Sequence, residues 1–503
     1  MRNSPTEPDT TVDLLIVGGG INGCGIARDA AGRGLSVMLC EKDDLAAHTS
    51  SASTKLIHGG LRYLEQYEFH LVRKSLIERE VLLRAAPHII WPLRFILPHH
   101  AGLRPAWLLR LGLFIYDHLG GRKLLPPTSS VALDRPPLAG LLKPDFRKGF
   151  EYSDCWVEDA RLVALNAVDA AEHGARIRTR TRVSALERKD EGWQARLTPE
   201  TGAAETVRAR AVVNAAGPWA DEVDGQIRHG RNTPHVKLVK GSHIVVRRLH
   251  ADPRAFIFQN TDGRIVFAIP YEGDYTLIGT TDQPVDKPED DAAISDSEID
   301  YLCDLASSYF AQPMTRDDIV WSYAGLRALY DDDEDNASKT TRDYRLEMVP
   351  DGPPALSVYG GKITTFRKLA EHALDKLGSA FPDMGPAWTS DAALPGGDIP
   401  DADFAGFLAD LRERYAAMPS ALLQRLARAY GTRVAAMLGD ATRPADLGLY
   451  FGAGLYEREV RYLMEQEFAR NSADILWRRS KLGLHMTPAE RDGLAGWIDE
   501  FSR

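Results

Sequence analysis

Three glycines near the start of the chain have the spacing of a pyrophosphate-binding turn. Gly18, Gly20 and Gly23 follow the pattern G-x-G-x-x-G. In this pattern the first glycine allows a tight turn, the second lets the backbone approach the phosphates, and the third lets a helix pack closely against a strand. Glu41 follows about 20 residues later, where the pattern places an acceptor for a ribose hydroxyl. These residues predict a dinucleotide-binding site.

A run of small hydroxyl side chains comes next. Residues 49–54 supply donors and acceptors suited to a loop against a polar cofactor, although a Ser/Thr-rich linker has a similar composition. The run leads directly into the turn His58-Gly59-Gly60, which is followed by Arg62 and Tyr63. Because a linker seldom continues into such a turn, we favour the interpretation as a cofactor loop.

Two later stretches predict further contact with the same ligand. Residues 209–219 form an apolar run that ends in Ala215-Ala216-Gly217, where the backbone can approach a ligand closely. Together with the first glycine motif, this run favours FAD over NAD. Residues 355–368 repeat the arrangement: an apolar run ends at Gly360-Gly361, and a predicted helix then begins with its N-terminus toward the ligand.

An α/β fold is needed to position these residues. Short apolar runs at 13–17 and 36–40 predict buried parallel strands. Alternating stretches between residues 235 and 282 predict an antiparallel sheet inserted into the nucleotide-binding domain. Residues 175–194 predict a strand pair, residues 87–105 an irregular segment, and residues 403–503 a helical domain. Further helices are predicted at residues 24–32, 66–86, 106–116, 160–173 and 366–378.

The composition is that of a globular protein of two or three domains. The chain has 503 residues, 44% of them hydrophobic, and a net charge of −10, which argues against a nucleic-acid partner. The four cysteines are scattered, so neither a disulfide framework nor a metal site is expected. Residues 1–11 predict a disordered tail, and no apolar stretch reaches the length of about 18 residues that a transmembrane helix requires.

One apolar segment has two interpretations. Residues 106–116 predict a helix that contains Trp107, and basic residues flank it over residues 94–123. A helix of this kind can lie in a membrane interface. A buried core helix has the same pattern, and these residues alone do not decide between the two.

Motifs distributed over nearly the whole chain match one family. They span residues 18–25, 53–65, 104–119, 149–161, 214–219, 241–246, 278–282, 341–344, 360–372 and 394–397. Through them the chain resembles the FAD-dependent, quinone-linked (aerobic) glycerol-3-phosphate dehydrogenases. The resemblance implies a Rossmann-like FAD domain of the glutathione-reductase type, an antiparallel substrate cap and a helical C-terminal domain.

The resemblance also implies an organisation and an activity. The FAD domain is expected at residues 12–90, 150–230 and 340–380, the cap at 91–149 and 231–339, and the C-terminal domain at 390–503. The expected reaction oxidises sn-glycerol 3-phosphate to dihydroxyacetone phosphate and passes electrons through FAD to a quinone. The family sits on the cytoplasmic face of the cell membrane without crossing it, which favours residues 94–123 as a membrane-contacting segment. We also expect a homodimer, although the motifs do not decide the oligomeric state.

This substrate requires cations for its phosphate and a base for its hydroxyl proton. Guanidinium groups offer parallel donors to phosphate oxygens; Arg62 and Arg327 are the first candidates, with Arg342 and Lys362 in support. Either His58 or His243 could accept the proton near neutral pH. The substrate hydroxyls are assigned to Tyr63, Thr280 and Thr281. The residues expected at FAD are Gly18, Gly20, Ile21, Asn22, Gly23, Glu41, Lys42, Thr49, Ser50, Ser51, Ser53, Thr54, Leu56, His58, Gly60, Val183, Ala216, Gly217, Gly361, Lys362, Ile363 and Thr364.

Three other functions share parts of this pattern. A glycerol-3-phosphate oxidase would have the same site but reduce O₂ to hydrogen peroxide. An FAD-dependent amino-acid oxidase of the same fold would bind a carboxylate and would not need several phosphate-binding cations. A flavin-binding scaffold would bind FAD without being reduced by any substrate.

Overall fold

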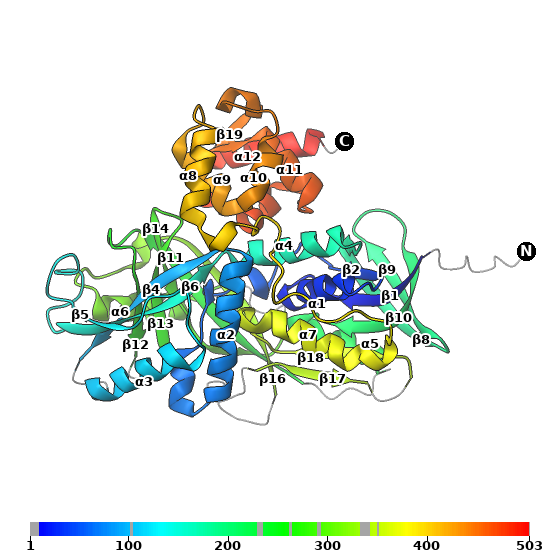
Figure 1. Cartoon of the computed structure of the whole chain (residues 1–503), viewed down its shortest axis with the longest axis horizontal. Helices are drawn as coiled ribbons and strands as arrows, with labels where there is room; N and C mark the ends of the chain where they lie inside the picture. Colours follow the sequence, from blue (N-terminus) through cyan, green and yellow to red (C-terminus); the bar gives the residue numbers. More distant parts are fainter. Residues whose placement is uncertain are drawn as a thin grey trace, which may run out of the picture.

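A computed structural model describes residues 10–100, 104–228, 235–260, 264–288, 293–331, 343–349 and 352–501. Two β-sheets lie side by side, and a helical C-terminal domain sits above them (Figure 1). Most of the predicted tail lies outside the described residues, but its last two residues begin the first strand, so residues 10 and 11 are not part of a disordered tail. Arg342 also lies outside the described residues.

The first sheet has the parallel core that the apolar runs predicted. Its main strands are in the order β17-β18-β10-β1-β2-β7, and β1 pairs in parallel with both β2 and β10. Strands β8 and β9 extend the sheet as an antiparallel pair beside β10. The strands are β1 (Thr10–Val17), β2 (Val37–Cys40), β7 (Arg176–Arg178), β8 (Thr181–Lys189), β9 (Gly192–Pro199), β10 (Glu205–Asn214), β17 (Arg345–Met348) and β18 (Ala355–Tyr359).

Side chains of β1 alternate between two cores because neighbouring residues of a strand face opposite sides of a sheet. Leu14 and Ile16 pack with the helices α1 (Ile21–Gly32), α4 (Asp159–Glu172) and α7 (Phe366–Leu377). Leu15 and Val17 pack on the other side, with β8, β9 and α5 (Ala220–Ile227). The first sheet is therefore covered on both faces, as its continuous apolar strands require.

The second sheet has ten strands and is antiparallel except where β12 pairs in parallel with β4. One sequence expectation needs correction here. The segment predicted as irregular contains the ten-residue strand β4, which pairs along its whole length with β6. Strand β3 and most of β6 pair within this sheet, and their residues 56–57 and 150–157 lie in ranges expected for the FAD domain. The strands are β3 (Leu56–Ile57), β4 (Ile90–His99), β5 (Ser129–Ala132), β6 (Lys148–Val157), β11 (Val236–Arg247), β12 (Ala255–Gln259), β13 (Ile265–Tyr271), β14 (Tyr275–Gly279), β15 (Gln283–Val285) and β16 (Ile319–Tyr330).

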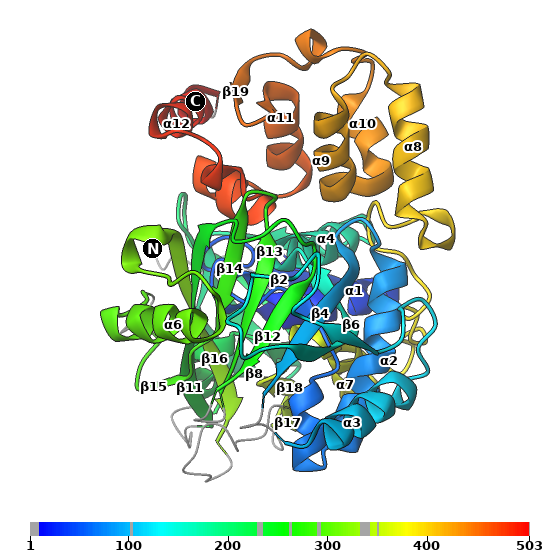
Figure 2. The ribbon, with the colours of Figure 1, turned by 90° about the vertical axis from the view of Figure 1, so that its left-hand side faces the viewer.

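Helices cover the second sheet on both faces. On one face, α6 (Asp296–Tyr309) packs through Leu302 and Ala306. On the other, α2 (Phe69–Ala85) and α3 (Ala106–Leu119) contribute buried residues to a separate core. Figure 2 shows α6 on one side of the strands and α2 with α3 on the other. The predicted helices at 66–86 and 106–116 are thus confirmed, with slightly different ends.

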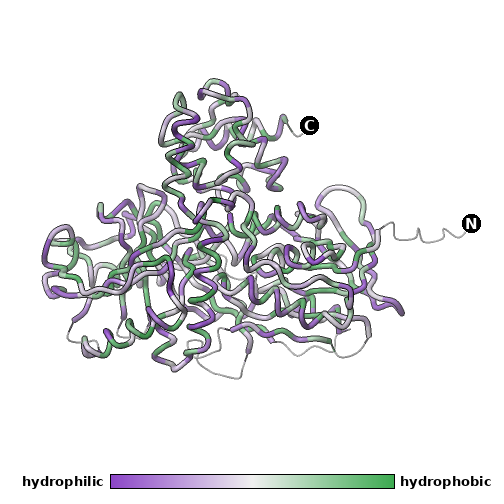
Figure 3. The backbone as a smooth tube through the Cα atoms, viewed as in Figure 1, coloured by the Kyte–Doolittle hydropathy of each residue, from purple (hydrophilic) through white to green (hydrophobic). Residues whose placement is uncertain are grey.

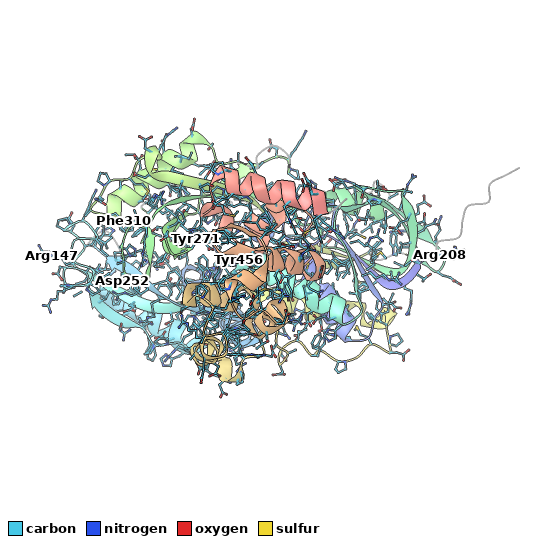
Figure 4. The ribbon with its side chains drawn as sticks, turned by 90° about the horizontal axis from the view of Figure 1, so that it is seen from above. Arg147, Arg208, Asp252, Tyr271, Phe310 and Tyr456 are labelled. Carbon is cyan, nitrogen blue, oxygen red and sulfur yellow. The ribbon has the colours of Figure 1, made fainter. Side chains whose placement is uncertain are left out.

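The C-terminal domain has its own hydrophobic core. Seen from above, it lies over the middle of the molecule, with Arg208 of the first sheet toward one end and Phe310 of the cap toward the other (Figure 4). The predicted helical character is confirmed, with one short hairpin added. The elements are α8 (Phe404–Arg414), α9 (Ser420–Tyr430), α10 (Val434–Leu438), β19 (Tyr450–Gly452), β20 (Leu455–Tyr456), α11 (Glu457–Gln466), the π-helix η10 (Asp474–Arg479) and α12 (Pro488–Phe501).

Hydrophobic and hydrophilic positions alternate over short intervals along the described residues (Figure 3). Within the described residues, none of the helices combines the length and the apolar character needed to cross a bilayer.

The junction between the first sheet and the C-terminal domain contains a buried histidine. The side chain of His88 is fully buried, and neither ring nitrogen has a hydrogen-bond partner among the described residues. Arg428 of α9 donates hydrogen bonds to the carbonyls of Pro87 and His88. Burial, together with the positive charges of Arg161, Arg428 and Arg433, lowers the pKa of His88 to about 3.

This histidine should make the protein less stable in acid. The unfolded chain takes up a proton on His88 near pH 6.5, whereas the folded protein does not until about pH 3. Acidification below pH 6.5 therefore favours unfolding, by about 2 kcal/mol at pH 5. We expect His88→Leu to lose less thermal stability than the wild type between pH 7 and pH 5. The exposed His70 provides the control: His70→Gln should retain the wild-type slope of Tm against pH, and an unchanged slope in His88→Leu would contradict the assignment.

Candidate functional site

The cavity that the predicted residues share lies where the two sheets meet. Its volume is about 420 Å³, and its wall includes the first glycine motif, the hydroxyl loop, the run at 215–219 and the turn at 360–364. Residues of both sheets therefore contribute to one site, although they are separated by up to several hundred positions in the sequence.

The glycine motif forms one end of this cavity. Gly18 has a φ of +112°, and a Cβ atom there would lie 2.5 Å from the carbonyl oxygen of Ala215. A Cβ atom at Gly23 would lie 1.9 Å from the carbonyl oxygen of Gly18. The turn can therefore form only without side chains at these two positions. It places the N-terminus of α1 at the cavity, where N–H groups can bind phosphate oxygens.

Glu41 lies beside this turn, at the end of β2. Its carboxylate accepts hydrogen bonds from the N–H of Gly19, at 2.6 Å, and from the N–H of Asp43, at 2.8 Å. Burial raises the pKa of Glu41, and these two backbone donors partly oppose that effect. The carboxylate is thus held rigidly at the position where dinucleotide-binding folds bind a ribose hydroxyl.

Three side chains lie close together beside Glu41. Carboxylate oxygens of Glu41 and Asp43 and a ring nitrogen of His48 lie within 4.8 Å of one another. Hydrogen bonds account for this arrangement without an ion, because His48 Nε2 lies 2.7 Å from Asp43 Oδ2 and Glu41 binds backbone N–H groups.

The hydroxyl loop is fastened to both sheets. Thr49 donates a hydrogen bond to the carbonyl of Leu326 on β16, and Ser50 Oγ accepts one from the N–H of Ile21 at 3.0 Å. A fully buried ion pair of 2.8 Å between Lys55 and Asp159 anchors the end of the loop. Ser53 also binds Asp159, at 2.8 Å. These contacts fix the loop along the cavity wall, as the interpretation as a cofactor loop requires.

Arg327 lies at the other end of the cavity, on β16. It forms an ion pair with Asp282 and donates a hydrogen bond of 3.1 Å to Thr280 Oγ1. Its side chain is 26% exposed, so the guanidinium remains accessible from the cavity. Gly241, on the neighbouring strand β11, makes room for it, since a Cβ atom there would lie 2.4 Å from Arg327 Nη2.

His243 lies near Arg327, on β11. Its ring stacks on Tyr323 with centroids 4.8 Å apart, and its Nε2 lies 3.0 Å from Thr54 Oγ1. Burial lowers the pKa of His243 well below its usual value, and the positive charges of Arg327 and Lys55 lower it further. The imidazole is therefore neutral at physiological pH and can accept a proton.

His58 also lines the cavity, beside the turn at 360–364. Its backbone N–H and carbonyl lie 3.3 Å and 3.4 Å from Thr364 Oγ1. In the same region, Lys362 Nζ lies 3.8 Å from the centroid of the Tyr63 ring. Among the described residues, five cationic side chains (Lys42, Arg62, Arg182, Arg327 and Lys362) and three carboxylates (Glu41, Glu222 and Asp282) line the cavity, and this excess of positive charge favours an anionic ligand.

Comparison with known proteins decides the family. A family model described as FAD dependent oxidoreductase matches residues 13–365, and one described as C-terminal domain of alpha-glycerophosphate oxidase matches residues 387–501. The chain belongs to the FAD-dependent oxidoreductases. The resemblance stated from the sequence motifs is thereby confirmed.

Similar proteins align over nearly the full length of the chain. The D-erythritol 1-phosphate dehydrogenase of Brucella abortus is 52% identical, with 98% of each chain covered. The glycerol-3-phosphate dehydrogenase of Pseudomonas aeruginosa is 50% identical, covering 99% of this chain and 97% of the relative. The structure of the glycerol-3-phosphate dehydrogenase from Bacillus halodurans, complexed with FAD, superimposes with a TM-score of 0.79 at 28% identity, covering 98% of this chain and 92% of that one.

FAD is the cofactor of this oxidoreductase, and the cavity fits it. The turn at Gly18 and Gly23, where a Cβ atom would collide with the backbone, brings the start of α1 to the cavity, and its N–H groups there suit a pyrophosphate. Glu41 offers a carboxylate to a ribose. Tyr152, Ile257, Ile265 and Phe267 form an apolar wall of the cavity on the side of the second sheet. The predicted fold, an FAD-binding α/β domain with a helical C-terminal domain, is confirmed.

Most of the predicted site residues line the cavity. They include the proposed histidines His58 and His243 and the substrate residues Arg62, Tyr63, Thr280 and Arg327. The expected FAD residues that line it are Gly18, Gly20, Ile21, Asn22, Glu41, Lys42, Thr49, Ser50, Ser53, Thr54, His58, Gly60, Val183, Ala216, Gly217, Gly361, Lys362, Ile363 and Thr364.

Four predicted residues do not line it. Gly23 lies behind the residues of the cavity wall, where it allows α1 to approach Gly18. Leu56 is buried in the core of the second sheet, and the Ser51 hydroxyl bonds the carbonyl of His48. Thr281 points into the cap, where its hydroxyl donates a hydrogen bond of 2.6 Å to Glu298. The role of Thr281 in binding a substrate hydroxyl is therefore corrected to a structural one.

Several residues of the wall were not predicted. Trp219 was part of a recognised motif, and its ring lies 3.4 Å from Lys42 Nζ and in edge contact with His48. Asp282 also belonged to a recognised motif, but only the structure pairs it with Arg327. For the apolar residues Ile257, Ile265 and Phe267, the sequence indicated only that they belong to alternating strands and not that they line a site.

Proposed function

We propose that this protein oxidises a phosphorylated polyol with FAD, and that its substrate is sn-glycerol 3-phosphate. The observation that carries the proposal is that Arg62, Arg327 and Lys362 line the same cavity as His243, whose pKa burial lowers well below its usual value. A phosphate needs such cations, and a hydroxyl needs such a base. The full-length relatives that act on phosphorylated polyols support the same substrate class.

The chemistry divides between the protein and the cofactor. FAD supplies the acceptor for the hydride that leaves the carbon bearing the secondary hydroxyl. His243 accepts the proton of that hydroxyl, and dihydroxyacetone phosphate results. Asp282 and Thr280 orient the guanidinium of Arg327, which binds the phosphate together with Arg62 and Lys362. The apolar wall keeps water away from the reacting carbon.

A second candidate substrate has a specific observation in its favour. The erythritol-phosphate-oxidising relative from Brucella abortus is 52% identical to this chain over 98% of its length. A four-carbon polyol phosphate offers the same phosphate and hydroxyl groups to the same residues. The two substrates therefore have to be separated by measurement.

An anaerobic reduction experiment tests the proposal. The purified yellow protein is mixed in a stopped-flow instrument with sn-glycerol 3-phosphate, D-erythritol 1-phosphate, unphosphorylated glycerol or glycine. We expect sn-glycerol 3-phosphate to bleach the flavin band with the highest second-order rate constant, and glycerol to be at least 100-fold slower because the phosphate contacts are lost, an effect of about 3 kcal/mol. Faster bleaching by D-erythritol 1-phosphate would reassign the substrate, bleaching by glycine would indicate an amino-acid oxidase, and no bleaching would leave a flavin-binding scaffold.

We further propose that electrons pass to a quinone while the protein is bound to the cytoplasmic face of the cell membrane. On α3 only Leu113 and Tyr116 are buried, whereas Trp107 is 69% exposed and Phe114 is 55% exposed. Exposed apolar side chains with arginines nearby suit an anionic lipid surface. A groove of about 270 Å³ between α3 and residues 61–69 shares Leu61, Arg62, Ile257 and Ile265 with the FAD cavity. A quinone ring in that groove would lie beside the flavin site.

Vesicle binding tests the membrane contact. The double variant Trp107→Ser/Phe114→Ser should bind vesicles of phosphatidylglycerol and phosphatidylcholine at least tenfold more weakly in a sedimentation assay, because two aromatic side chains no longer enter the interface. Leu449→Ser changes an apolar residue of the C-terminal domain that is 54% exposed and serves as the control. Equal binding by both variants would contradict this surface.

Quinone reduction and hydrogen peroxide yield, measured in the same preparations, separate a dehydrogenase from an oxidase. The homodimer stays a prediction, which light scattering in mild detergent can test.

A further inference from the structure

One short segment of the C-terminal domain reaches two loops of the FAD cavity. This segment is the π-helix η10, and three of its six residues, Asp474, Arg478 and Arg479, bind residues of the first sheet's loops. Neither the glycine pattern of the FAD site nor the substrate chemistry above requires these contacts.

The first contact holds the loop that follows β2. Arg479 donates two parallel hydrogen bonds to the carboxylate of Asp44, at 2.7 Å and 2.8 Å, and Arg478 adds a third at 2.6 Å. Asp44 and Arg479 are 2% and 1% exposed, respectively. The neighbours of Asp44 in the loop form part of the cavity wall, namely Glu41, Lys42, Ala46, Ala47 and His48.

Arg479 is itself held firmly. Its Nε donates a hydrogen bond of 2.8 Å to the carbonyl of Glu467. Burial by itself would raise the pKa of Asp44, but the hydrogen bonds and charges of Arg479 and Arg478 outweigh burial and lower the pKa below its usual range. Asp44 is therefore charged in the folded protein, and its buried negative charge is stabilised by these two arginines.

The second contact holds the loop before β8. Asp474 is fully buried and accepts two hydrogen bonds of 2.9 Å from Arg180. The next residues, Thr181, Arg182 and Val183, line the cavity. The two loops are also joined to each other, since the N–H of Thr181 donates a hydrogen bond of 2.7 Å to the carbonyl of Glu41.

We infer that Arg479 and Asp474 are positioning residues for FAD, through which the C-terminal domain sets the affinity for the adenosine half of the cofactor. Glu41 marks this end of the cavity as the ribose end. Loops that are held in the bound conformation before FAD arrives do not have to be ordered during binding, so less of the binding free energy is lost. The inference rests on FAD binding and is independent of the substrate and of the electron acceptor.

A simpler explanation is that these ion pairs only dock one domain on another. The structure offers a matched contact for comparison: Arg433 of the C-terminal domain binds Glu172 of α4 through two hydrogen bonds of 2.6 Å. Neither of these two residues lines the FAD cavity. Arg433→Gln therefore removes a contact between the same domains without touching either loop.

Ligand titrations of the full-length apoprotein test the inference. We expect Arg479→Gln to raise the Kd for FAD by roughly tenfold or more and the Kd for ADP by a similar factor, while the Kd for FMN, which lacks the adenosine half, changes less than twofold. Arg433→Gln should leave all three constants within twofold of wild type. Arg479→Lys keeps the charge but cannot form the two parallel hydrogen bonds, so its values should lie between those of wild type and Arg479→Gln.

A double-mutant cycle and a second contact make the test decisive. Because Asp44 and Arg479 act as a pair, the effects of Asp44→Asn and Arg479→Gln on FAD affinity should not add. Asp474→Asn weakens the contacts of Asp474 with Arg180 and Arg478 and the local turn. It should raise the Kd for ADP in the same direction and carries the test if Arg479→Gln does not fold. The inference is overturned if folded variants bind ADP like wild type, if FMN affinity falls as much as ADP affinity, or if Arg433→Gln has the same effect.

Discussion

Arg327→Ala should lower kcat/KM for sn-glycerol 3-phosphate by roughly 100- to 1,000-fold, because the proposed charge-assisted contact with the phosphate is lost. The substitution also removes the ion pair between Arg327 and Asp282 in the cavity wall, so less positive charge opposes the repulsion between this carboxylate and a phosphate. FAD should stay bound, because the glycine turn and the loops at the other end of the cavity are unchanged. Steady-state kinetics and the flavin absorbance of the purified variant provide the two measurements.

Two further variants sharpen this prediction. Arg327→Lys keeps the positive charge but loses the planar fork, so it should recover only part of the activity. Arg316→Ala removes a surface arginine that pairs with Asp300 and Asp296 of α6, away from the cavity, and it should behave like wild type. A value of kcat/KM within threefold of wild type in Arg327→Ala would remove this residue from the phosphate site.

His243→Asn should slow the anaerobic reduction of the flavin by roughly 100- to 10,000-fold at pH 7.5, which is the range for loss of a general base. Asparagine fills a similar volume but cannot accept the hydroxyl proton. His58→Asn should have a smaller effect if His243 is the base. His250→Asn serves as the control for general damage to the fold. His250 is another buried histidine of the cap, and its ring bonds a backbone carbonyl outside the cavity.

The pH dependence provides a second test of His243. Its pKa lies well below the usual value because the ring is buried near Arg327 and Lys55. The neutral form therefore persists as pH falls, and the reduction rate of the wild type should decline only at a pH below about 6.5, the ordinary pKa of histidine. A decline centred above that value would contradict His243 as the base. A large loss in His58→Asn with normal reduction in His243→Asn would assign the role to His58, and normal reduction in both would exclude a histidine base.

Several residues of the cavity wall could be predicted because their positions depend on local backbone requirements. Gly18 has a φ of +112° in a tight turn, and Gly23 of α1 packs directly against Gly18. Neither position can accommodate a side chain, and the sequence shows this requirement as the spacing of its glycines. Buried parallel strands are continuous apolar runs, so β1, β2 and β18 could be identified, and Glu41 followed from its place after β2.

The predictions failed where long-range pairing outweighs local pattern. Residues 90–99 contain two prolines, which suggested irregular structure, but pairing with β6 along ten residues makes them a strand. Thr280 and Thr281 are neighbours with the same chemistry, yet successive residues point in opposite directions, so only Thr280 reaches the cavity while Thr281 binds Glu298.

The sequence by itself determined that this chain binds a dinucleotide through a glycine turn, that arginines and histidines accompany that turn, and that a helical domain follows. The tertiary structure decided which of these side chains meet. The ion pair between Arg327 and Asp282 and the contact of Arg479 with Asp44 join residues 45 and 435 positions apart. No local preference of the chain encodes such pairs, because they form only when two sheets and a separate domain have packed and buried the charges together.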